Sequence, residues 1–384
     1  MDNIILSSAL AFLITYISIP VIILVAKDKK LFDEPDERKV HKAVTPTLGG
    51  LGIFAGFILA TLMGVPPAIS GHLQFFIAAT VVIFILGVKD DILVLSATKK
   101  FIGQLIAGGI IIKFGGLQIN NMHGFLGINE IPHTASIIFT LFTIIVITNS
   151  FNLIDGVDGL AGSLGLLTAG IFGIYFFATG QLMYAVMALA LVGSLFAFLI
   201  YNFSPAKIFM GDTGSLLIGL LNSIFVIKFI SVASDPFVNM PLQSAPAIGF
   251  AILVVPLFDT LRIFSLRILN GRSPFSPDKN HIHHFLLDLG LNHKMITLVC
   301  VATNILFIAL AYFLRTSGTT WVVGALASMA VLFVGVIYFS RPKQKLISSD
   351  TLNSHEKSEI LNSDEKIIKS HKILTLAGGP VEQD

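Results

Sequence analysis

The sequence predicts an all-α polytopic integral membrane protein, on three observations. Hydrophobic residues make up 54% of the 384-residue chain and charged residues only 12%, and the mean hydropathy is +0.84. The apolar residues also form long runs, without the alternation of a transmembrane β-barrel. These properties exclude a soluble globular domain. The net charge of +2 gives no indication of a nucleic-acid partner, and the single cysteine, Cys300, excludes a disulfide or a thiolate metal cluster.

Eleven apolar runs are candidate transmembrane helices. The first lacks the basic region of a signal peptide and is too long for a signal-peptide core, so it is expected to remain as a span. The fourth is the weakest, because it is rich in glycine and contains Lys113. In order, the predicted spans are 3–26, 48–70, 73–88, 101–117, 131–148, 160–178, 183–201, 214–234, 246–266, 296–314 and 320–340.

The basic residues predict the orientation of these helices. The segment 27–47 contains six Lys and Arg residues, and such segments stay on the cytoplasmic side of the membrane. Alternation from there places the N-terminus outside and the C-terminus in the cytoplasm. Four of the opposite loops agree because they contain no Lys or Arg; they are 71–72, 118–130, 179–182 and 235–245.

The dense clusters of ionisable residues all fall in loops assigned to the cytoplasm. A transporter, which is the alternative class, would bury charges near mid-membrane between helices, and few charges lie there in this sequence. We therefore predict a reactive surface on the cytoplasmic face, carried by a polytopic domain over residues 1–340. Residues 341–384 form a polar cytoplasmic tail of mixed charge that is predicted to be flexible.

The segment 149–162 is unusually polar for a connection between two apolar runs. Asn149, Asn152, Asp155 and Asp158 recur every third residue, so three of the four can share a helix face. The glycines among them favour a broken, tightly turning backbone over a regular helix. One interpretation is an Asx-rich turn that caps the next helix. The other is an oxygen-rich site for a hard divalent cation and its phosphate ligand.

Two further cytoplasmic loops carry carboxylates. Asp90 and Asp91 follow the third span, and adjacent residues cannot share a helix face, so one is expected to face the site while the other binds backbone. The turn at Asp212 opens the eighth span, where backbone N–H groups and the helix dipole suit a phosphate and the carboxylate suits a metal. Asn202 adds a polar group to this loop. The structural alternatives are helix-end residues in solvent and an Asp N-cap.

The loop after the ninth span contains Arg272, His281, His283 and His284. Three histidines in four residues suggest zinc, but no cysteine lies nearby and the acids of the other loops are hard oxygen ligands. Histidines beside Arg272 suit a diphosphate held by charge-assisted hydrogen bonds. Structural capping is the remaining alternative.

Two features are interpreted as wholly or partly structural. Asp259 and Arg262, three residues apart at the inner end of the ninth span, are expected to form an ion pair. Lys39 and Lys42 precede a Pro/Gly turn in the first cytoplasmic loop. This loop anchors the chain by the positive-inside rule and is expected to bind an anion as well.

Together these residues resemble the polyprenyl-phosphate N-acetylhexosamine-1-phosphate transferase superfamily (glycosyltransferase 4 family), over roughly residues 1–315. One position departs from the pattern: many members carry a third acidic residue three positions after the Asp-Asp pair, where this chain has Val94. The matching motifs, in family order, are Arg38-Lys39-x-His41 with Pro46-x-x-Gly49-Gly50, Asp90-Asp91, Asn149-x-x-Asn152-x-x-Asp155-Gly-x-Asp158-Gly159, Pro205-Ala-Lys-Ile-Phe-Met-Gly-Asp212-x-Gly-Ser and His281-x-His283-His284.

The resemblance implies a reaction and a cofactor. GlcNAc-1-phosphate, or a related HexNAc-1-phosphate, would pass from a UDP-N-acetylhexosamine to undecaprenyl phosphate at the cytoplasmic face of a bacterial inner membrane. UMP would be released and a lipid-linked cell-surface glycan begun. The resemblance also implies Mg²⁺, or Mn²⁺, bound by Asn152 and Asp212, while Asp90 or Asp91 would orient the lipid phosphate. The implied catalytic group comprises Asp90, Asp91, Asp155, Asp158 and His281, and the implied substrate-binding residues are Lys39, Lys42, Asn149, Asn202, Phe209 (on the uracil), Arg272, His283 and His284.

Several alternatives stay open at this point. The His-x-His-His pattern resembles the GlcNAc-1-phosphate branch more than phospho-MurNAc-pentapeptide transferase, which remains the alternative enzyme beside a non-catalytic transporter. The sequence decides neither the HexNAc donor, nor the downstream glycan, nor whether transfer is direct or proceeds through a covalent intermediate. The oligomeric state is also open, and the apolar helix faces allow a homodimer.

Overall fold

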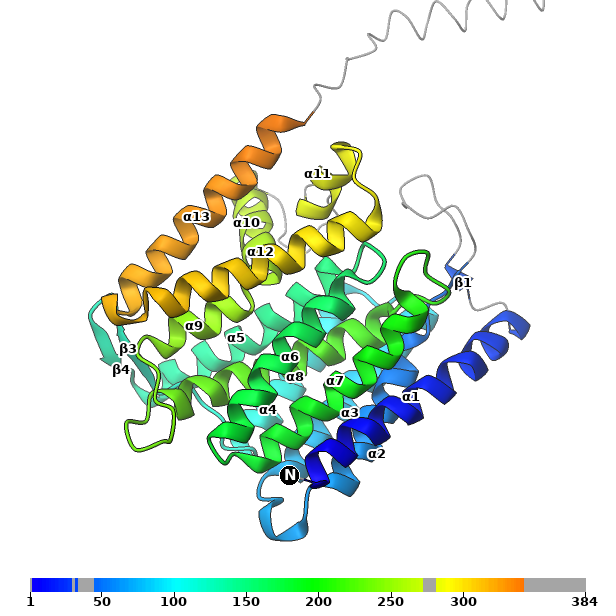
Figure 1. The fold of residues 1–384 in the computed structure, drawn as a ribbon, viewed down its shortest axis with the longest axis horizontal. Coiled ribbons are helices and arrows are strands. Elements are labelled where there is room, and N and C mark those ends of the chain that lie inside the picture. Colours follow the sequence, from blue (N-terminus) through cyan, green and yellow to red (C-terminus); the bar gives the residue numbers. More distant parts are fainter. Residues whose placement is uncertain (1, 30–31, 34–44, 272–280, 342–384) are drawn as a thin grey trace, which may run out of the picture. The chain divides into compact units, whose positions relative to one another are not determined.

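The computed structural model describes residues 2–29, 32–33, 45–271 and 281–341. The predicted flexible tail, apart from its first residue, lies outside them, as do Lys39, Lys42 and Arg272. The described chain is mostly helical (Figure 1). Its α-helices are α1 (Asp2–Asp28), α2 (Gly49–Gly64), α3 (Leu73–Leu93), α4 (Ala97–Lys113), α5 (His133–Ile154), α6 (Leu160–Ala178), α7 (Leu182–Asn202), α8 (Gly211–Ala233), α9 (Ala245–Ile252), α10 (Val254–Leu269), α11 (Ile282–Asp288), α12 (His293–Phe313) and α13 (Thr319–Ser340).

Two small antiparallel hairpins depart from the all-α prediction. One pairs β1 (Phe32–Asp33) with β2 (Thr45–Pro46), and the other pairs β3 (Asn121–Phe125) with β4 (Ile128–Glu130). The second hairpin lies at the opposite end of the helices from α11 and β1 (Figure 1). This is the arrangement expected if 118–130 and 267–295 lie on opposite sides of a membrane.

The protein is a polytopic membrane protein, with seven helices in the described ranges that are long and apolar enough to cross a bilayer. These are α1, α5, α6, α7, α8, α12 and α13, and the bent pair α9–α10 adds an eighth if it is one span. Every predicted span overlaps a helix, but those on α2, α3 and α4 do not meet the same criteria, α2 being only 16 residues long.

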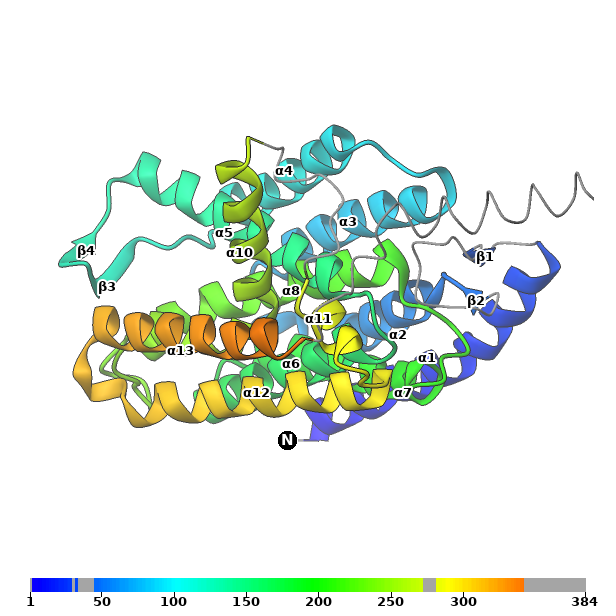
Figure 2. The same cartoon turned by 90° about the horizontal axis from the view of Figure 1, so that it is seen from above.

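The predicted continuous span 246–266 is wrong in one respect. The chain breaks at Leu253 and α10 turns from α9 by 84°. Figure 2 shows α10 running across the direction of α12 and α13. The Asn304 side chain holds the break: its Oδ1 accepts from the N–H of Val255 at 3.2 Å and its Nδ2 donates to the carbonyl of Ile252 at 2.9 Å. Backbone groups freed by the bend are thereby satisfied inside the apolar core.

Helix α8 is the most completely buried of the candidate spans, with 83% of its apolar window inside the protein. It packs against α2, α3, α5 and α6. Glycines allow the closest approaches: a Cβ at Gly219 would lie 2.6 Å from Thr148 Cα of α5, and one at Gly87 of α3 would lie 2.5 Å from Thr213 Cα. As a result, the N-terminus of α8 lies beside the ends of α3 and α5, where the polar motifs are.

Candidate active site

The carboxylate of Asp91, at the end of α3, caps the N-terminus of α8. Its Oδ1 accepts from the backbone N–H of Asp212 at 2.7 Å, and its Oδ2 accepts from the N–H and the hydroxyl of Thr213 at 3.0 and 2.5 Å. Glycine is required at position 211, because φ is +70° and a Cβ would lie 2.7 Å from Asp91 Oδ2. The N–H groups that the sequence predicted for a phosphate are therefore bound by a carboxylate of the protein itself.

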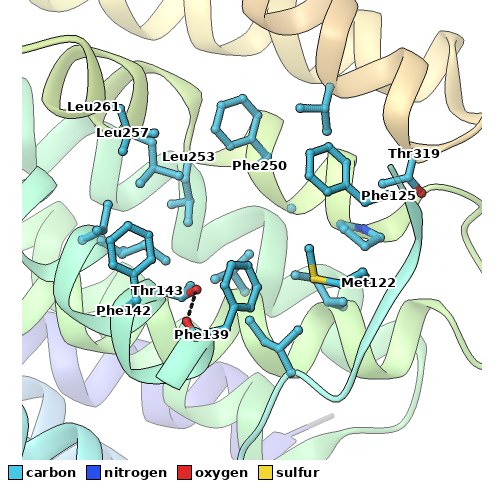
Figure 3. Close-up of a pocket in the computed structure, with 18 of the residues that line it drawn as sticks. Met122, Phe125, Phe139, Phe142, Thr143, Phe250, Leu253, Leu257, Leu261 and Thr319 are labelled. Carbon is cyan, nitrogen blue, oxygen red and sulfur yellow. Dashed lines mark hydrogen bonds between the residues drawn. The ribbon is translucent and has the colours of Figure 1, made fainter. Parts of the chain in front are cut away.

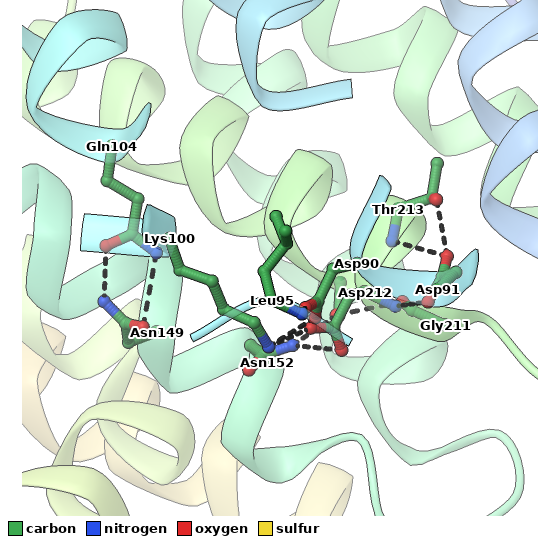
Figure 4. Close-up of polar contacts among 11 residues, drawn as sticks. Asp90, Asp91, Leu95, Lys100, Gln104, Asn149, Asn152, Gly211, Asp212 and Thr213 are labelled. Carbon is green, nitrogen blue, oxygen red and sulfur yellow. Dashed lines mark hydrogen bonds and ion pairs between the residues drawn. The ribbon is translucent and has the colours of Figure 1, made fainter. Parts of the chain in front are cut away.

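The neighbouring Asp90 faces the other way and shares a cation with Asp212. The Lys100 ammonium, from the first turn of α4, contacts Asp90 Oδ2 and lies 2.5 Å from Asp212 Oδ2 (Figure 4). Asp90 Oδ1 accepts from the N–H of Leu95 at 2.5 Å. The two adjacent carboxylates point in different directions, as expected: Asp91 binds the backbone of α8, and Asp90 faces Lys100 while also accepting from the backbone of Leu95.

Asn152 completes this cluster from α5. Its Nδ2 donates to Asp212 Oδ1 at 2.9 Å and to the hydroxyl of Ser215 at 3.1 Å. The prediction of a broken backbone over the whole polar segment is wrong for residues 149–154, because α5 continues through Ile154 and the turn is confined to 155–159. The close packing of α5 on α8 therefore sets the position of Asn152.

Asn149 lies one helical turn earlier and faces a different partner. Its Nδ2 donates to Gln104 Oε1 at 2.8 Å, and Gln104 Nε2 returns a hydrogen bond to Asn149 Oδ1 at 3.2 Å (Figure 4). The Gln104 side chain is buried. This reciprocal pair joins α4 to α5 and so helps to fix Lys100 relative to Asn152. The structure does not bring the Asn149 amide into the carboxylate cluster.

Asp155 ends α5 and begins the turn. Burial, followed by repulsion from the carboxylates of Asp212, Asp91 and Asp158, raises the pKa of Asp155 to about 8. The polar motifs of three separate loops therefore act on one another electrostatically. Such a shift is typical of a carboxyl group that is removed from water and lies near other carboxylates.

Asp158 and Asn202 bind loops to one another. Asp158 Oδ2 accepts from the N–H of Ala206 at 3.2 Å and lies 3.3 Å from His293 Nδ1. Asn202 Oδ1 accepts from the N–H of Gly159 at 2.9 Å, while its Nδ2 donates to the carbonyl of Ile208 at 2.9 Å. Both side chains are buried. In the structure they hold the 155–159 turn against the 203–210 loop.

Phe209 belongs to the loop that enters α8. Its backbone N–H donates to the carbonyl of Pro46 at 2.7 Å, and its carbonyl accepts from Gly49 at 2.9 Å. The Pro/Gly turn of the first cytoplasmic loop therefore pairs with the segment before Asp212. The Phe209 side chain is partly exposed.

The histidine motif forms α11, and Asp259 of α10 holds its first turn. Asp259 Oδ2 lies 2.8 Å from His281 Nδ1, and Asp259 Oδ1 accepts from the N–H of Ile282 at 3.0 Å. The predicted ion pair with Arg262 is confirmed at 2.9 Å. Asp259 is buried, and it serves both that pair and His281.

His283 packs on the turn that follows Asn152 and Asp155. A Cβ at Gly156 would lie 2.6 Å from His283 Nε2, so this glycine leaves the space for the ring. Burial, followed by the charges of His284 and His281, lowers the pKa of His283 to about 3. The imidazole is therefore neutral at physiological pH. The His284 ring centroid lies 4.4 Å from that of His283.

Within the described ranges, no three His, Cys, Asp or Glu side chains are grouped as ligands for one metal ion. The donor chemistry nevertheless fits a hard divalent cation. Asp90 and Asp212 already share the Lys100 ammonium, and the carboxylates of Asp212, Asp91 and Asp158 act electrostatically on Asp155. Carboxylate and amide oxygens are the donors that Mg²⁺ and Mn²⁺ prefer.

Three residues near these motifs were missed from the sequence: Lys100, Gln104 and His293. Lys100 gave one usable signal, since a lysine in the first turn of a helix opposes the helix dipole and indicates another purpose. Gln104 and His293 gave none, because their partners lie 45 and 135 residues away in the sequence.

The sequence is similar to those of known proteins. Residues 73–230 match the family model "Glycosyl transferase family 4". A probable undecaprenyl-phosphate N-acetylglucosaminyl 1-phosphate transferase of Bacillus subtilis is 33% identical over 88% of this chain and 90% of its own length. The decaprenyl-phosphate N-acetylglucosaminephosphotransferase of Mycobacterium leprae is 34% identical over 75% and 78%. An undecaprenyl-phosphate alpha-N-acetylglucosaminyl 1-phosphate transferase of Yersinia pestis is 28% identical over 79% and 83%. The chain belongs to glycosyl transferase family 4.

Proposed function

We propose that this protein transfers GlcNAc-1-phosphate from UDP-GlcNAc to undecaprenyl phosphate and so starts a lipid-linked glycan. An oxygen of the lipid phosphate forms a bond to the sugar-bearing phosphorus, the bond between that phosphorus and the bridging oxygen breaks, and UMP leaves. The names of the relatives support this donor and this acceptor. The eleven predicted spans and the basic loops favour a cytoplasmic site in a bacterial inner membrane.

The observation that carries the proposal is the shared contact of Lys100 with Asp90 and Asp212. Joining two phosphate groups requires that positive charge and fixed hydrogen bonds offset their repulsion, with little covalent chemistry by the protein. Lys100 would contact phosphate oxygens. Asp90 would orient the lipid phosphate through its contact with Lys100, whereas both oxygens of Asp91 are bound to α8. Asp91 would act by fixing the position of Asp212.

Asn152 and Asp212 would hold Mg²⁺ or Mn²⁺, with Asp155 and Asp158 completing the metal and nucleotide site. The bound cation would neutralise the phosphates and polarise the phosphorus. Lys100 must then exchange at least one of its carboxylate contacts for a phosphate. A bound cation would favour the ionised form of Asp155, whose pKa is raised by burial and by the neighbouring carboxylates.

The nucleotide and diphosphate would bind beside the 155–159 turn and α11, which are already in contact through Gly156 and His283. His281, fixed by Asp259, and His284 would bind the diphosphate, and neutral His283 would act as a hydrogen-bond partner. Phe209, which is partly exposed, would stack on the uracil.

The polyprenyl chain of the acceptor requires an apolar surface, and an apolar pocket of about 370 Å³ lies between α5, α8 and the bent α9–α10 pair (Figure 3). Leu257 and Leu261 of α10 line it, with Phe139 and Thr143 of α5. The Thr143 hydroxyl donates to the carbonyl of Phe139 at 2.8 Å, so its polarity is satisfied within α5. We assign this pocket to part of the prenyl chain.

Purified protein would test the reaction with undecaprenyl phosphate, Mg²⁺ and UDP-GlcNAc labelled on both sugar and uridine. We expect labelled UMP in the aqueous phase and labelled sugar in the lipid phase. Release of UDP would mean ordinary glycosyl transfer and would contradict the mechanism. If UDP-GlcNAc gives no product but UDP-GalNAc or UDP-MurNAc-pentapeptide is turned over, the reaction class is correct and the proposed donor is wrong.

A further inference from the structure

Gln104 and Asn149 form a reciprocal amide pair between α4 and α5, beside the carboxylate cluster (Figure 4). Lys100 and Gln104 are four residues apart on α4, so they share a face of that helix. Asn149 and Asn152 share a face of α5 in the same way, three residues apart. The two helices are therefore joined twice: by the amide pair, and through Asp212, which contacts both Lys100 and Asn152.

The amide pair engages the hydrogen-bond donors of Asn149. Its Nδ2 donates to Gln104 Oε1 at 2.8 Å and also to the carbonyl of Ile145 at 2.8 Å. Its Oδ1 accepts from Gln104 Nε2 at 3.2 Å. An asparagine amide has two N–H donors, and both are used here within the protein. The Asn149 side chain in this arrangement serves the joint between the helices and has no N–H group left for an oxygen of a substrate.

The beginning of α4 has few other features that fix its position. Ser96 does not cap the helix with its side chain, and Lys100 lies near the positive end of the helix dipole. Gln104 is the first buried residue of the helix. At Gly103 and Gly108, α4 lies against leucine side chains of α3 and α5. Such apolar contacts are non-directional, whereas a reciprocal pair of hydrogen bonds fixes the register of two helices.

The ion pairs of Lys100 cannot hold α4 throughout the proposed reaction. Lys100 contacts Asp90 and Asp212, and it must exchange at least one of these contacts for a phosphate of the substrate. Neither hydrogen bond between Gln104 and Asn149 involves these carboxylates. The amide pair is therefore retained while the contacts of Lys100 change.

We propose that Gln104 and Asn149 are positioning residues, which hold the Lys100 ammonium within reach of the phosphates when it leaves a carboxylate. This inference rests on the proposed function, and it assigns both residues to the support of Lys100 and not to contact with substrate. Without the pair, α4 can turn or slide on its apolar contacts with α5. A displacement of about 1 Å in an active site lowers the rate by about 100-fold.

Gln104→Leu and Asn149→Leu each remove the amide pair and keep a side chain of similar volume. Activity would be measured as UMP release from UDP-GlcNAc with undecaprenyl phosphate at saturating Mg²⁺. We expect each variant to lower kcat about tenfold or more, while KM for UDP-GlcNAc stays within about twofold. Gln104→Leu added to Lys100→Met should cost little further, because the effects of residues that act through one another are not additive.

Ser136→Ala is the matched control. Ser136 is buried on the same helix as Asn149, and its hydroxyl donates to Asn120 Oδ1 at 2.7 Å, so this variant also removes a hydrogen bond between side chains. Ser136 lies 13 residues before Asn149, about 20 Å along the helix. Ser136→Ala should leave kcat unchanged even where it lowers Tm.

The position of Lys100 can also be measured without turnover. Full-length protein would be treated with an amine-acetylating reagent, and the acetylation of single lysines followed by mass spectrometry. Lys100, held between carboxylates, should react more slowly than the exposed Lys99. Gln104→Leu should raise the rate at Lys100 toward that at Lys99, and Ser136→Ala should not. If Gln104→Leu does not fold, Gln104→Asn decides, because its shorter amide cannot make both hydrogen bonds.

Each of three results would overturn the proposal. One is a kcat of Gln104→Leu equal to that of Ser136→Ala, or an acetylation rate at Lys100 that Gln104→Leu does not change. Another is a raised KM for UDP-GlcNAc with unchanged kcat, which would show that the pair binds substrate. The third is a loss from Gln104→Leu that is just as large in the Lys100→Met protein. If the unmodified protein releases no UMP, the proposed function is wrong, and the acetylation rates still show whether the pair positions Lys100.

Discussion

The Lys100 ammonium lies 2.5 Å from a carboxylate oxygen of Asp212, although 112 residues separate them in sequence. The same ammonium contacts Asp90, so one lysine joins the ends of three helices, α3, α4 and α8. A charge-assisted contact of this kind contributes more than a surface ion pair, because its members are partly removed from water.

Lys100→Met is expected to lower kcat by about 100-fold or more, since it removes a positive charge from the phosphate site. Lys99→Met is the control, because Lys99 is exposed on the same turn. Both variants would be assayed for UMP release at saturating Mg²⁺. A Lys100→Met enzyme with a rate close to that of the control would contradict the role of Lys100.

Asp212→Asn is expected to abolish turnover while the protein still folds and inserts into the membrane. The substitution keeps the shape of the side chain and removes the charge that Lys100 and a divalent cation would share. Turnover would be measured at saturating Mg²⁺, and size-exclusion elution would show whether the variant still folds. A near-normal rate would show that Asp212 is not a metal ligand.

Asp91→Asn is expected to act mainly on stability. An amide would present a donor to one of the N–H groups of Asp212 and Thr213, and leaving a buried donor unsatisfied costs about 1–3 kcal/mol. The Tm in detergent should fall clearly below that of the unmodified protein. An unchanged Tm with lost activity would instead place Asp91 in direct contact with substrate.

Asp155 makes cation binding depend on pH. Its pKa is raised to about 8, so below that pH the metal-free protein carries a proton that a cation must displace. The rise in Tm produced by Mg²⁺ should therefore be larger near pH 8.5 than near pH 6.5, and Asp155→Asn should remove most of the difference. Without metal, the pH dependence has the opposite direction. The contribution of Asp155 to the free energy of unfolding falls as pH rises from the ordinary carboxyl pKa toward 8, because the unfolded chain loses this proton first. A Mg²⁺ effect on Tm that is equal at both pH values would contradict this reading.

His281→Ala is expected to raise KM for UDP-GlcNAc or to lower kcat. Asp259→Asn should have a similar effect, because its Oδ2 lies 2.8 Å from His281 Nδ1, and the double variant should cost little more than either single one. Steady-state kinetics of the three variants test this. If the losses in the two single variants add up in the double variant, Asp259 does not act through His281. If elemental analysis finds stoichiometric zinc, the histidines bind zinc and not the diphosphate.

Thr143→Phe tests the prenyl pocket. The added ring would occupy space that Leu257 and Leu261 also line, and the lost hydroxyl bonds only within α5. We expect KM for undecaprenyl phosphate to rise about tenfold while KM for UDP-GlcNAc stays unchanged. Equal changes in both KM values would remove the pocket from acceptor binding.

The sequence by itself determined where the helices lie and which loops carry the chemistry. Long apolar runs and clustered basic residues are local signals, and all eleven predicted spans overlap helices. The Asp-Asp pair likewise had to divide its roles, because adjacent residues point to different sides of a helix.

Only the tertiary structure decided which side chains meet. The capping of α8 by Asp91, the contact of Lys100 with Asp212 and the support of His281 by Asp259 join residues 22 to 122 positions apart. The bend at Leu253 depends on Asn304, 49 residues beyond Val255. No local pattern encodes such contacts, since they follow from how closely α3, α5 and α8 can pack at Gly87 and Gly219. Helices are set by short-range periodicity, whereas a site built from several helix ends is set by packing between distant segments.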